Sequence, residues 1–369
     1  MPFHRFRIFI ALALVGVVQL AGSDSVFASN NEPQYLHVSM RSAALTSFWG
    51  QPVSIDAHIL LPDSYYKQPA RRYPVFYWIQ GFNGRGDIDV DDEVRWQKPM
   101  RRSGLQFILV FLNGMFDGGH QEFADSANNG PWGTALTTEF IPRTEERFRA
   151  IDAPAARFVG GHSSGGWSAL WLQVTYPELF GGEWSLSPDP VDFRNFTGPN
   201  LTLSPPQNFF NDPSGQRYML YDQPMSVFVK RPGWQSMQML SFEQVFSPKG
   251  ADGKPERLFD RNSGVIDPNV ASYWEAHYDI SRILQDHWDT LAPQLRGKLH
   301  IFVGSNDNFQ LNESVDLLKQ RLDAVHSDAE ITIARGLDHW SIFTVNGDAI
   351  AYILQEAETS LQRSNDGPS

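Results

Sequence analysis

The chain of 369 residues carries 30 Lys and Arg against 42 Asp and Glu, a formal net charge of −12 at pH 7. This acidic balance excludes nucleic acid as the expected partner, because phosphate backbones are bound by clustered basic side chains. The chain contains no cysteine, so disulfides, a cysteine nucleophile and thiolate metal ligands are excluded. Its length suffices for one large domain or for a domain with an insertion.

The first residues have the pattern of an export signal. Arg5 and Arg7 precede an apolar run over 8–20, and Val26-Phe27-Ala28 supplies small or apolar residues at the usual cleavage positions. The run is short for a bilayer span, so a cleaved signal peptide over residues 1–28 is favoured over an uncleaved anchor. We therefore expect a secreted or periplasmic protein with no stable membrane insertion after cleavage.

Five apolar runs in the N-terminal half have the length of strands. The runs 34–40 and 53–61 alternate apolar and polar residues, as half-buried edge strands do. The runs 73–79, 107–112 and 157–161 are continuous and end at Gly or Asn-Gly, which is typical of buried parallel strands.

Helix-like segments at 135–150 and 164–176 accompany these strands, and the pattern returns near the C-terminus. There, strands are expected at 299–303 and 331–334, and helices at 312–325 and 349–361. This alternation predicts a mostly parallel central sheet flanked by helices.

Residues 192–288 break the alternation. The segment is rich in Pro, Gly, Asn and aromatic residues and lacks clean periodicity. It is too aromatic to be disordered. We predict an irregular, cap-like insertion within a single domain over 29–369, placed over the C-terminal edge of the sheet and shaping the substrate site.

The sequence Gly161-His162-Ser163-Ser164-Gly165 joins a predicted strand to a predicted helix. Its Gly-x-Ser-x-Gly pattern is common by chance, but this context is that of a nucleophile elbow, and only Ser163 satisfies the pattern. The flanking glycines are expected where a Cβ would collide with neighbouring backbone. Ser163 is therefore the candidate nucleophile.

A nucleophilic serine needs a base, and the base needs an acid to orient it. With a nucleophile elbow, the order along the chain is Ser, then Asp or Glu, then His. Asp307 follows a late predicted strand and His339 lies in the loop after the next, which makes them the candidate acid and base. Asp338 is the weaker alternative acid, because adjacent side chains seldom reach each other. His162 adjoins the serine and is expected to be structural, since neighbouring side chains point apart.

Two backbone N–H groups are needed to hold the developing oxyanion. Ser164, which follows the nucleophile, and Phe82, in the glycine loop after an early strand, are the candidates. Three side chains are candidates for substrate binding: His120 in a glycine-rich loop, and Trp132 and Trp340 as platforms for a sugar or aryl group. Core packing is the alternative for the tryptophans.

The acidic run 87–93 has the carboxylate spacing of a calcium loop. However, Asp92 and Lys98 stand where that loop has its glycine and its final glutamate. A solvated loop is the better interpretation, and we expect no metal site.

On these residues, from about Pro52 to the last helix, the chain resembles the putative esterase family of esterase D-like α/β-hydrolases. Segment 77–84 is similar to the family's strand and oxyanion loop, and 161–166 to its elbow. Asp307 and His339 fall where the family has its acid and base. Gln80 departs from the pattern, since many members have His before the oxyanion glycine.

The resemblance implies an α/β-hydrolase fold and a serine hydrolase that cleaves carboxylic esters through a Ser-His-Asp triad and an acyl-enzyme, with no cofactor. The family includes feruloyl and acetyl-xylan esterases and S-formylglutathione hydrolases, so small-molecule or glycan-linked esters are the expected substrates. Acyl transfer to an alcohol, and a non-catalytic binding protein on the same scaffold, remain alternatives. The sequence determines neither the individual ester nor the oligomeric state.

Overall fold

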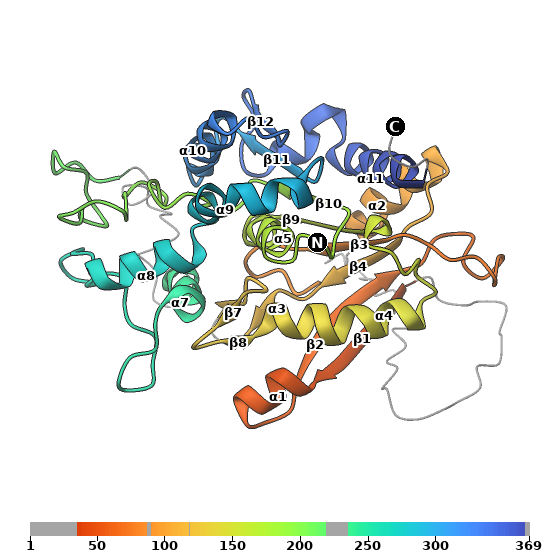
Figure 1. The fold of residues 1–369 in the computed structure, drawn as a ribbon, viewed down its shortest axis with the longest axis horizontal. Helices are drawn as coiled ribbons and strands as arrows, with labels where there is room; N and C mark the ends of the chain where they lie inside the picture. Colours follow the sequence, from red (N-terminus) through yellow and green to blue (C-terminus); the bar gives the residue numbers. More distant parts are fainter. Residues whose placement is uncertain (1–34, 87–89, 118, 219–234, 366–369) are drawn as a thin grey trace, which may run out of the picture.

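The computed structural model describes residues 35–86, 90–117, 119–218 and 235–365, and the predicted signal peptide lies outside these ranges (Figure 1). One eight-stranded sheet forms the centre of the molecule. Its strands, in spatial order, are β1 (Tyr35–Ser42), β2 (Val53–Leu60), β4 (Ile108–Leu112), β3 (Val75–Ile79), β9 (Arg157–His162), β10 (Gly182–Leu186), β11 (Leu299–Gly304) and β12 (Glu330–Ala334). The pairs β1–β2 and β2–β4 are antiparallel, and every other pair is parallel.

Helices cover both faces of this sheet. The described helices are α1 (Ala43–Trp49), α2 (Val90–Ser103), α3 (Trp132–Ala135), α4 (Ile141–Arg147), α5 (Ser164–Thr175), α7 (Gln235–Phe246), α8 (Pro268–Tyr278), α9 (Ile280–Leu295), α10 (Leu311–Ala324) and α11 (Ala349–Asn365). Of these, α7 and α8 lie beyond the sheet (Figure 1). A π-helical turn, Leu136–Phe140, joins α3 to α4, and short 3-10 helices span Pro154–Ala156 and Ser341–Gly347. Two small hairpins pair β5 (Met115–Phe116) with β6 (Gly119–His120), and β7 (Asp125–Ser126) with β8 (Gly130–Pro131).

The side chains of each strand divide between the two faces, because successive residues of a strand point in opposite directions. On β3, Phe76 and Trp78 pack in the core beneath α2 and α11, whereas Val75, Tyr77 and Ile79 pack in the core beneath the α3–α4 segment. All five residues are buried. The continuous apolar run that predicted a buried parallel strand is therefore confirmed.

Strand β10 was not predicted, because its sequence Gly-Glu-Trp-Ser-Leu has no apolar run. Its polar side chains are nevertheless buried and bonded: the Ser185 hydroxyl lies 2.7 Å from the Gly166 carbonyl oxygen and 2.8 Å from Glu183 Oε2, and His300 N–H donates to Glu183 Oε1 at 3.1 Å. Burial raises the pKa of Glu183 to about 8, so this carboxyl is neutral near pH 7. A buried neutral acid is compatible with a central strand, but a search for apolar runs does not identify a strand that contains one.

Of the loop expected at 87–93, residues 87–89 lie outside the described ranges, and residues 90–93 are helical instead, since α2 begins at Val90. Carboxylates in a first helical turn are favoured by the partial positive charge of the helix N-terminus, so an acidic run can begin a helix. Across the described helices, none is both long and apolar enough to cross a membrane.

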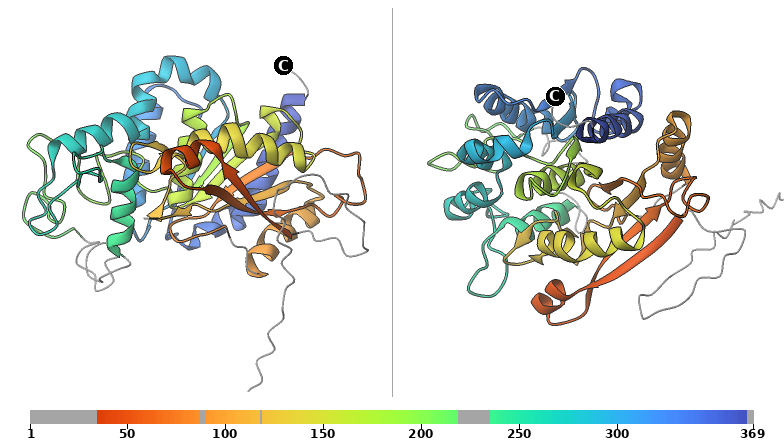
Figure 2. Two further views of the ribbon diagram at one scale, coloured as in Figure 1. Left: turned by 90° about the horizontal axis from the view of Figure 1, so that it is seen from below. Right: turned by 45° about the vertical axis from the view of Figure 1, so that its right-hand side comes forward.

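The segment 192–288 is more regular than predicted, since it contains α7, α8 and the start of α9. These helices lie together at one end of the molecule (Figures 1 and 2). Phe193, Phe246 and Trp274 contact one another there and share a core with residues of α5 and α10. The segment is therefore packed onto the same core as the sheet. That it shapes the substrate site stays a prediction.

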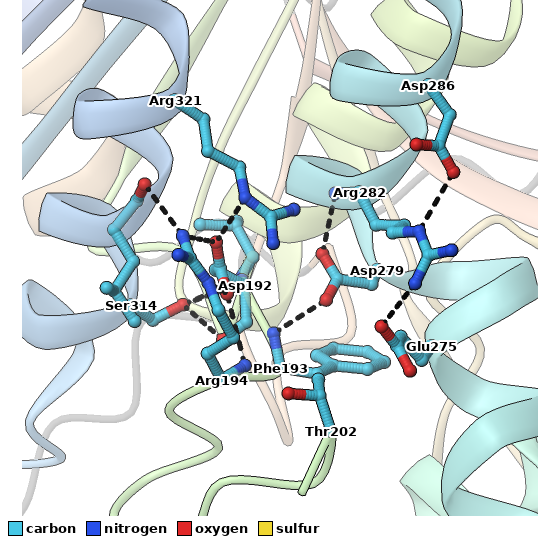
Figure 3. A network of polar contacts seen from close by, with 12 residues as sticks. Asp192, Phe193, Arg194, Thr202, Glu275, Asp279, Arg282, Asp286, Ser314 and Arg321 are labelled. Carbon is cyan, nitrogen blue, oxygen red and sulfur yellow. Dashed lines mark hydrogen bonds and ion pairs between the residues drawn. The ribbon is translucent and has the colours of Figure 1, made fainter. Parts of the chain in front are cut away.

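Polar contacts close the base of this segment (Figure 3). Where the chain enters, the Asp192 carboxylate binds the Arg194 guanidinium at 2.7 Å, and Asp192 N–H donates to Ser314 Oγ of α10 at 2.9 Å. Where the chain leaves, Asp279 Oδ2 accepts the Phe193 N–H at 2.9 Å. The two ends are thus bonded to each other and to α10, so residues 192–279 leave and rejoin the domain at one point.

Candidate active site

The nucleophile elbow lies at the end of the central strand β9. Ser163 has φ 60° and ψ −125°, a conformation that a non-glycine residue adopts only when its surroundings impose it. A Cβ on Gly161 would lie 2.1 Å from the Gly165 carbonyl oxygen, and a Cβ on Gly165 would lie 2.0 Å from that of Ile79. The expected steric role of both flanking glycines is confirmed. The turn presents Ser163 at the carboxyl edge of the sheet.

Asp307 and His339 come together although 32 residues separate them. His339 Nδ1 lies 2.8 Å from Asp307 Oδ2, and both side chains are buried. Asp307 Oδ1 accepts the Phe309 N–H at 2.8 Å, which fixes the carboxylate plane. Because an ionised carboxylate only accepts, Nδ1 carries the proton and the lone pair of His339 is left on Nε2, as a general base requires. Asp338, the alternative acid, bonds instead to Ser341.

The loops that carry the acid and the base are bonded to each other. Asn306 N–H donates to the Leu337 carbonyl at 2.9 Å, Gly336 N–H to Ser305 Oγ at 2.9 Å, and His339 N–H to the Asn308 side-chain oxygen at 3.2 Å. Adjacent parallel strands β11 and β12 deliver both loops to the same edge. The tertiary structure thereby sets the spacing of Asp307 and His339.

His162 connects the elbow to the base loop. Its Nε2 lies 2.9 Å from the His339 carbonyl oxygen, and the two rings lie 4.5 Å apart. Burial and the neighbouring His339 lower the pKa of His162 to about 3, so the ring is neutral and Nε2–H donates. The structural role expected for His162 is therefore specific: its ring bonds the His339 backbone, which ties the loop of the candidate base to the residue before Ser163.

The glycine loop after β3 lies against the elbow. A Cβ on Gly81 would lie 2.8 Å from Ser163 Cβ and 3.0 Å from the His162 carbonyl oxygen. Gly84 N–H donates to the Gly81 carbonyl at 2.8 Å and closes the loop as a turn. Phe82, a predicted oxyanion donor, therefore stands in a loop in contact with the candidate nucleophile.

Ser164, the other predicted oxyanion donor, begins α5. An N–H in the first turn of a helix has no partner within the helix, so it is available to an anion. Its hydroxyl donates to Asp189 Oδ2 at 2.5 Å in a buried environment. Burial, and next the charge of Glu122, raise the pKa of Asp189 to about 7. Neither Asp189 nor Glu122 was identified from the sequence, since Asp189 follows the unpredicted strand β10.

His120 does not line the site, contrary to what was expected of a substrate-binding residue. It is 1% exposed, and its Nε2 lies 3.1 Å from the Gln80 carbonyl oxygen, inside the protein behind the glycine loop. Its Nδ1 lies 3.3 Å from Glu122 Oε1. The ring therefore contacts the loop and does not reach the surface that a substrate would touch.

The two tryptophans proposed as platforms differ in exposure. Trp132 is 1% exposed, its Nε1–H donates to the Asn129 carbonyl, and its ring packs on Phe116. The substrate-binding role expected for Trp132 is thus corrected to core packing, the alternative for a large aromatic residue. Trp340 is 65% exposed, and its ring lies 5.0 Å from that of His339. Trp340 is the expected platform that the structure leaves open to a ligand.

A pocket of about 140 Å³ adjoins the glycine loop and the elbow. Gln80, Gly81 and His162 border it on the side of the elbow. The remaining lining residues are largely aromatic: Trp78, Arg95, Trp96, Phe111 and Phe343. The pocket therefore combines aromatic rings with the polar side chains of Gln80, Arg95 and His162. Clefts lined by aromatic residues with a few polar groups are common ligand sites.

The fold, together with the residues at the carboxyl edge of the sheet, identifies the class of protein. A mostly parallel eight-stranded sheet with a serine elbow after its central strand is an α/β-hydrolase, so the predicted fold class is confirmed. More narrowly, the chain belongs to the family described as "Putative esterase", whose model matches residues 50–327. The predicted family is therefore also confirmed.

Solved structures with this fold include several esterases. A ferulic acid esterase is similar with a TM-score of 0.54 at 15% identity, over 89% of this chain and 98% of that chain. The S-formylglutathione hydrolase of Agrobacterium tumefaciens gives the same four values. That of Staphylococcus aureus gives a TM-score of 0.52 at 13% identity, over 89% of this chain and 98% of that one. No curated protein sequence matches the chain.

Proposed function

We propose that the protein is a serine esterase that hydrolyses carboxylic esters through Ser163, His339 and Asp307. The observation that carries this proposal is the 2.8 Å contact between His339 Nδ1 and Asp307 Oδ2, in a loop that His162 bonds to the elbow of Ser163. Membership of the esterase family supports the same reaction class.

In this mechanism, His339 Nε2 takes the proton of Ser163 as the serine oxygen attacks the ester carbonyl carbon. Asp307 stabilises the imidazolium that forms. The oxyanion accepts the N–H groups of Phe82 and Ser164. The imidazolium then gives its proton to the departing alkoxide, which leaves as the alcohol, and an acyl-serine remains. Water, deprotonated by His339, releases the acid and restores Ser163.

For the substrate, we propose small-molecule or glycan-linked esters with a short or aryl acyl group, ferulate esters among them. The aromatic lining of the 140 Å³ pocket beside the elbow supports an acyl group of this kind. Exposed Trp340 next to His339 supports a ring in the leaving alcohol, because sugars and aryl groups stack on open aromatic faces. One fold neighbour is named a ferulic acid esterase.

The test measures hydrolysis of p-nitrophenyl acetate and methyl ferulate by the purified protein and by Ser163→Ala. We expect hydrolysis by the wild type and a loss of at least about 10³-fold in the variant. The control is Ser47→Ala, at an exposed position of α1. Equal activity of wild type and Ser163→Ala would refute the assignment. Added glycerol distinguishes acyl transfer, since glyceryl esters would then appear among the products.

We also propose that the protein is exported and that its signal is removed after Ala28. The basic and apolar pattern of residues 1–28 supports this. The intact mass of the protein recovered from cells is the test. A mature chain that begins at Ser29 is expected, and a full-length chain held in the membrane fraction would contradict it.

A further inference from the structure

The two expected oxyanion donors come from separate elements. Phe82 lies in the loop after β3, and Ser164 lies 82 residues later at the start of α5. An oxyanion hole works only when both N–H groups converge on one point at about 2.7–3.1 Å. Some contact must therefore fix the loop relative to α5.

His120 holds the loop from behind. Its Nε2 lies 3.1 Å from the Gln80 carbonyl oxygen, which can only accept, so Nε2 carries a proton. This holds for the neutral ring, whose Nδ1 accepts the Glu122 N–H at 3.1 Å, and for the charged ring as well. Because a trans peptide is planar, a bond to the Gln80 carbonyl fixes the plane of the Gln80–Gly81 peptide. That peptide leads directly into Phe82.

The other side of His120 is connected to α5. Its Nδ1 lies 3.3 Å from Glu122 Oε1, and Glu122 Oε2 lies 3.1 Å from the Ser168 hydroxyl oxygen. Ser168 lies one turn after Ser164 and is also within 2.8 Å of the Ser164 carbonyl oxygen. A continuous chain of buried polar contacts thus runs from Gln80 through His120, Glu122 and Ser168 to the elbow helix.

Packing and a main-chain hydrogen bond leave the His120 side chain little freedom to move. A Cβ on Gly114 would lie 2.1 Å from His120 Nε2, so the ring packs directly on that backbone. The His120 carbonyl accepts the Ser241 hydroxyl at 2.7 Å, which fixes the main chain. Burial lowers the pKa of His120, but the charges and hydrogen bonds of Glu122, with Asp189, outweigh this and raise it overall. Each protonation state keeps Nε2–H on Gln80.

From this geometry we propose that His120 is a positioning residue for the oxyanion hole, acting through its Nε2–H bond to the Gln80 carbonyl and through Glu122 and Ser168 to α5. The inference rests on the proposed esterase function. It replaces the substrate contact expected for His120, which burial excludes. Without the bond, the Gln80–Gly81 peptide can rotate, and the transition state loses part of its stabilisation while ground-state binding changes little.

Two variants distinguish the effect of losing the hydrogen bond to Gln80 from the effect of losing the imidazole ring. In His120→Gln, the amide nitrogen reaches about as far as Nε2 and can donate to Gln80. In His120→Asn, the amide ends near the position of Nδ1 and cannot. For p-nitrophenyl acetate we expect kcat of His120→Asn to fall at least about tenfold at little changed KM, less than the 10²–10³-fold loss of a whole donor. His120→Gln should recover at least fivefold of that loss.

A second readout concerns the tetrahedral state itself. A trifluoromethyl ketone, which forms an oxyanion on the nucleophile, should lose affinity for His120→Asn by the same factor as kcat. The matched control is His300→Leu, which removes another buried bond from a ring nitrogen, at 2.9 Å to the Glu183 carbonyl. His300 lies near the amino end of β11, away from the carboxyl edge that carries the site. This control should lower Tm and leave kcat unchanged.

The outcomes separate the two proposals. A wild type without hydrolysis or fluorophosphonate labelling refutes the esterase function. An active wild type with equal kcat in His120→Asn and His120→Gln refutes the positioning role, as does a loss that appears in KM and Tm alone. Where His120→Asn does not fold, Glu122→Gln takes its place. This variant keeps the bond to Ser168 and weakens the hold on His120, so an unchanged kcat and inhibitor affinity would overturn the proposal.

Discussion

Replacing Glu183 with glutamine should change how the stability of the protein depends on pH. Burial in β10 raises the pKa of Glu183 from its ordinary value of 4.5 to about 8. A rise of this size corresponds to roughly 5 kcal/mol between the two protonation states. Domains are stable by about 5–15 kcal/mol in total, so the effect is a large part of the whole.

The direction follows from proton binding. Between pH 4.5 and about 8 the folded state holds the Glu183 proton and the unfolded state has released it. The contribution of Glu183 to the free energy of unfolding is thus fully present below pH 4.5 and is lost as the pH rises through about 8. The contacts agree with a protonated acid: one Ser185 proton cannot serve both the Gly166 carbonyl and Glu183, so Glu183 can donate to Ser185 while Ser185 donates to Gly166.

Glutamine keeps this shape and cannot ionise. We expect Glu183→Gln and wild type to have similar unfolding free energies at pH 4.5. The variant should be more stable by several kcal/mol, up to roughly 5, at pH 9. Guanidinium unfolding at pH 4.5, 6, 7.5 and 9 measures this. Asp189 and Asp279, whose pKa values burial raises to about 7, titrate in both proteins and cancel in the difference.

The matched control is Glu256→Gln, since Glu256 is exposed. It should leave the pH dependence of unfolding unchanged. Parallel curves for wild type and Glu183→Gln across the whole range would refute the argument, because they would mean that Glu183 titrates alike in the folded and unfolded chains.

Three further changes test the site. Asp307→Asn should lower kcat about 10⁴-fold with little change in Tm, because His339 loses its orienting acceptor; a loss below tenfold would contradict this in a p-nitrophenyl acetate assay. Gly165→Ala should destabilise the fold by about 1–3 kcal/mol and abolish esterase activity, since its Cβ would lie 2.0 Å from the Ile79 carbonyl oxygen; wild-type Tm and kcat would show that the elbow has more room. Trp340→Ala should raise KM for aryl or glycosyl esters about 3–30-fold and leave methyl acetate unaffected; equal KM changes for both would argue against stacking.

Local sequence patterns predicted most of the sheet and the chain order of the candidate site. Continuous apolar runs identified the buried strands β3, β4 and β9, because a strand covered on both faces needs no polar side chain. The positions of Asp307 and His339 after later strands predicted that these two side chains would meet at the carboxyl edge, where the Gly-x-Ser-x-Gly turn presents Ser163. These features depend on neighbours in the chain or on the direction of parallel strands, and a sequence records both.

Contacts between distant segments were decided by the tertiary structure alone. Strand β10 was not predicted because it contains Glu183 and Ser185. These polar side chains can be buried only because groups from other elements form hydrogen bonds with them. His120 and Trp132 were expected to bind substrate, and packing placed both inside the protein. Buried partners also come from other segments of the chain: Asp189 bonds the Ser164 hydroxyl, and His120 of β6 bonds the Gln80 carbonyl in the loop that carries Phe82. The type of a polar residue gives the hydrogen bonds that its side chain can make. Only the tertiary structure determines which partner makes them.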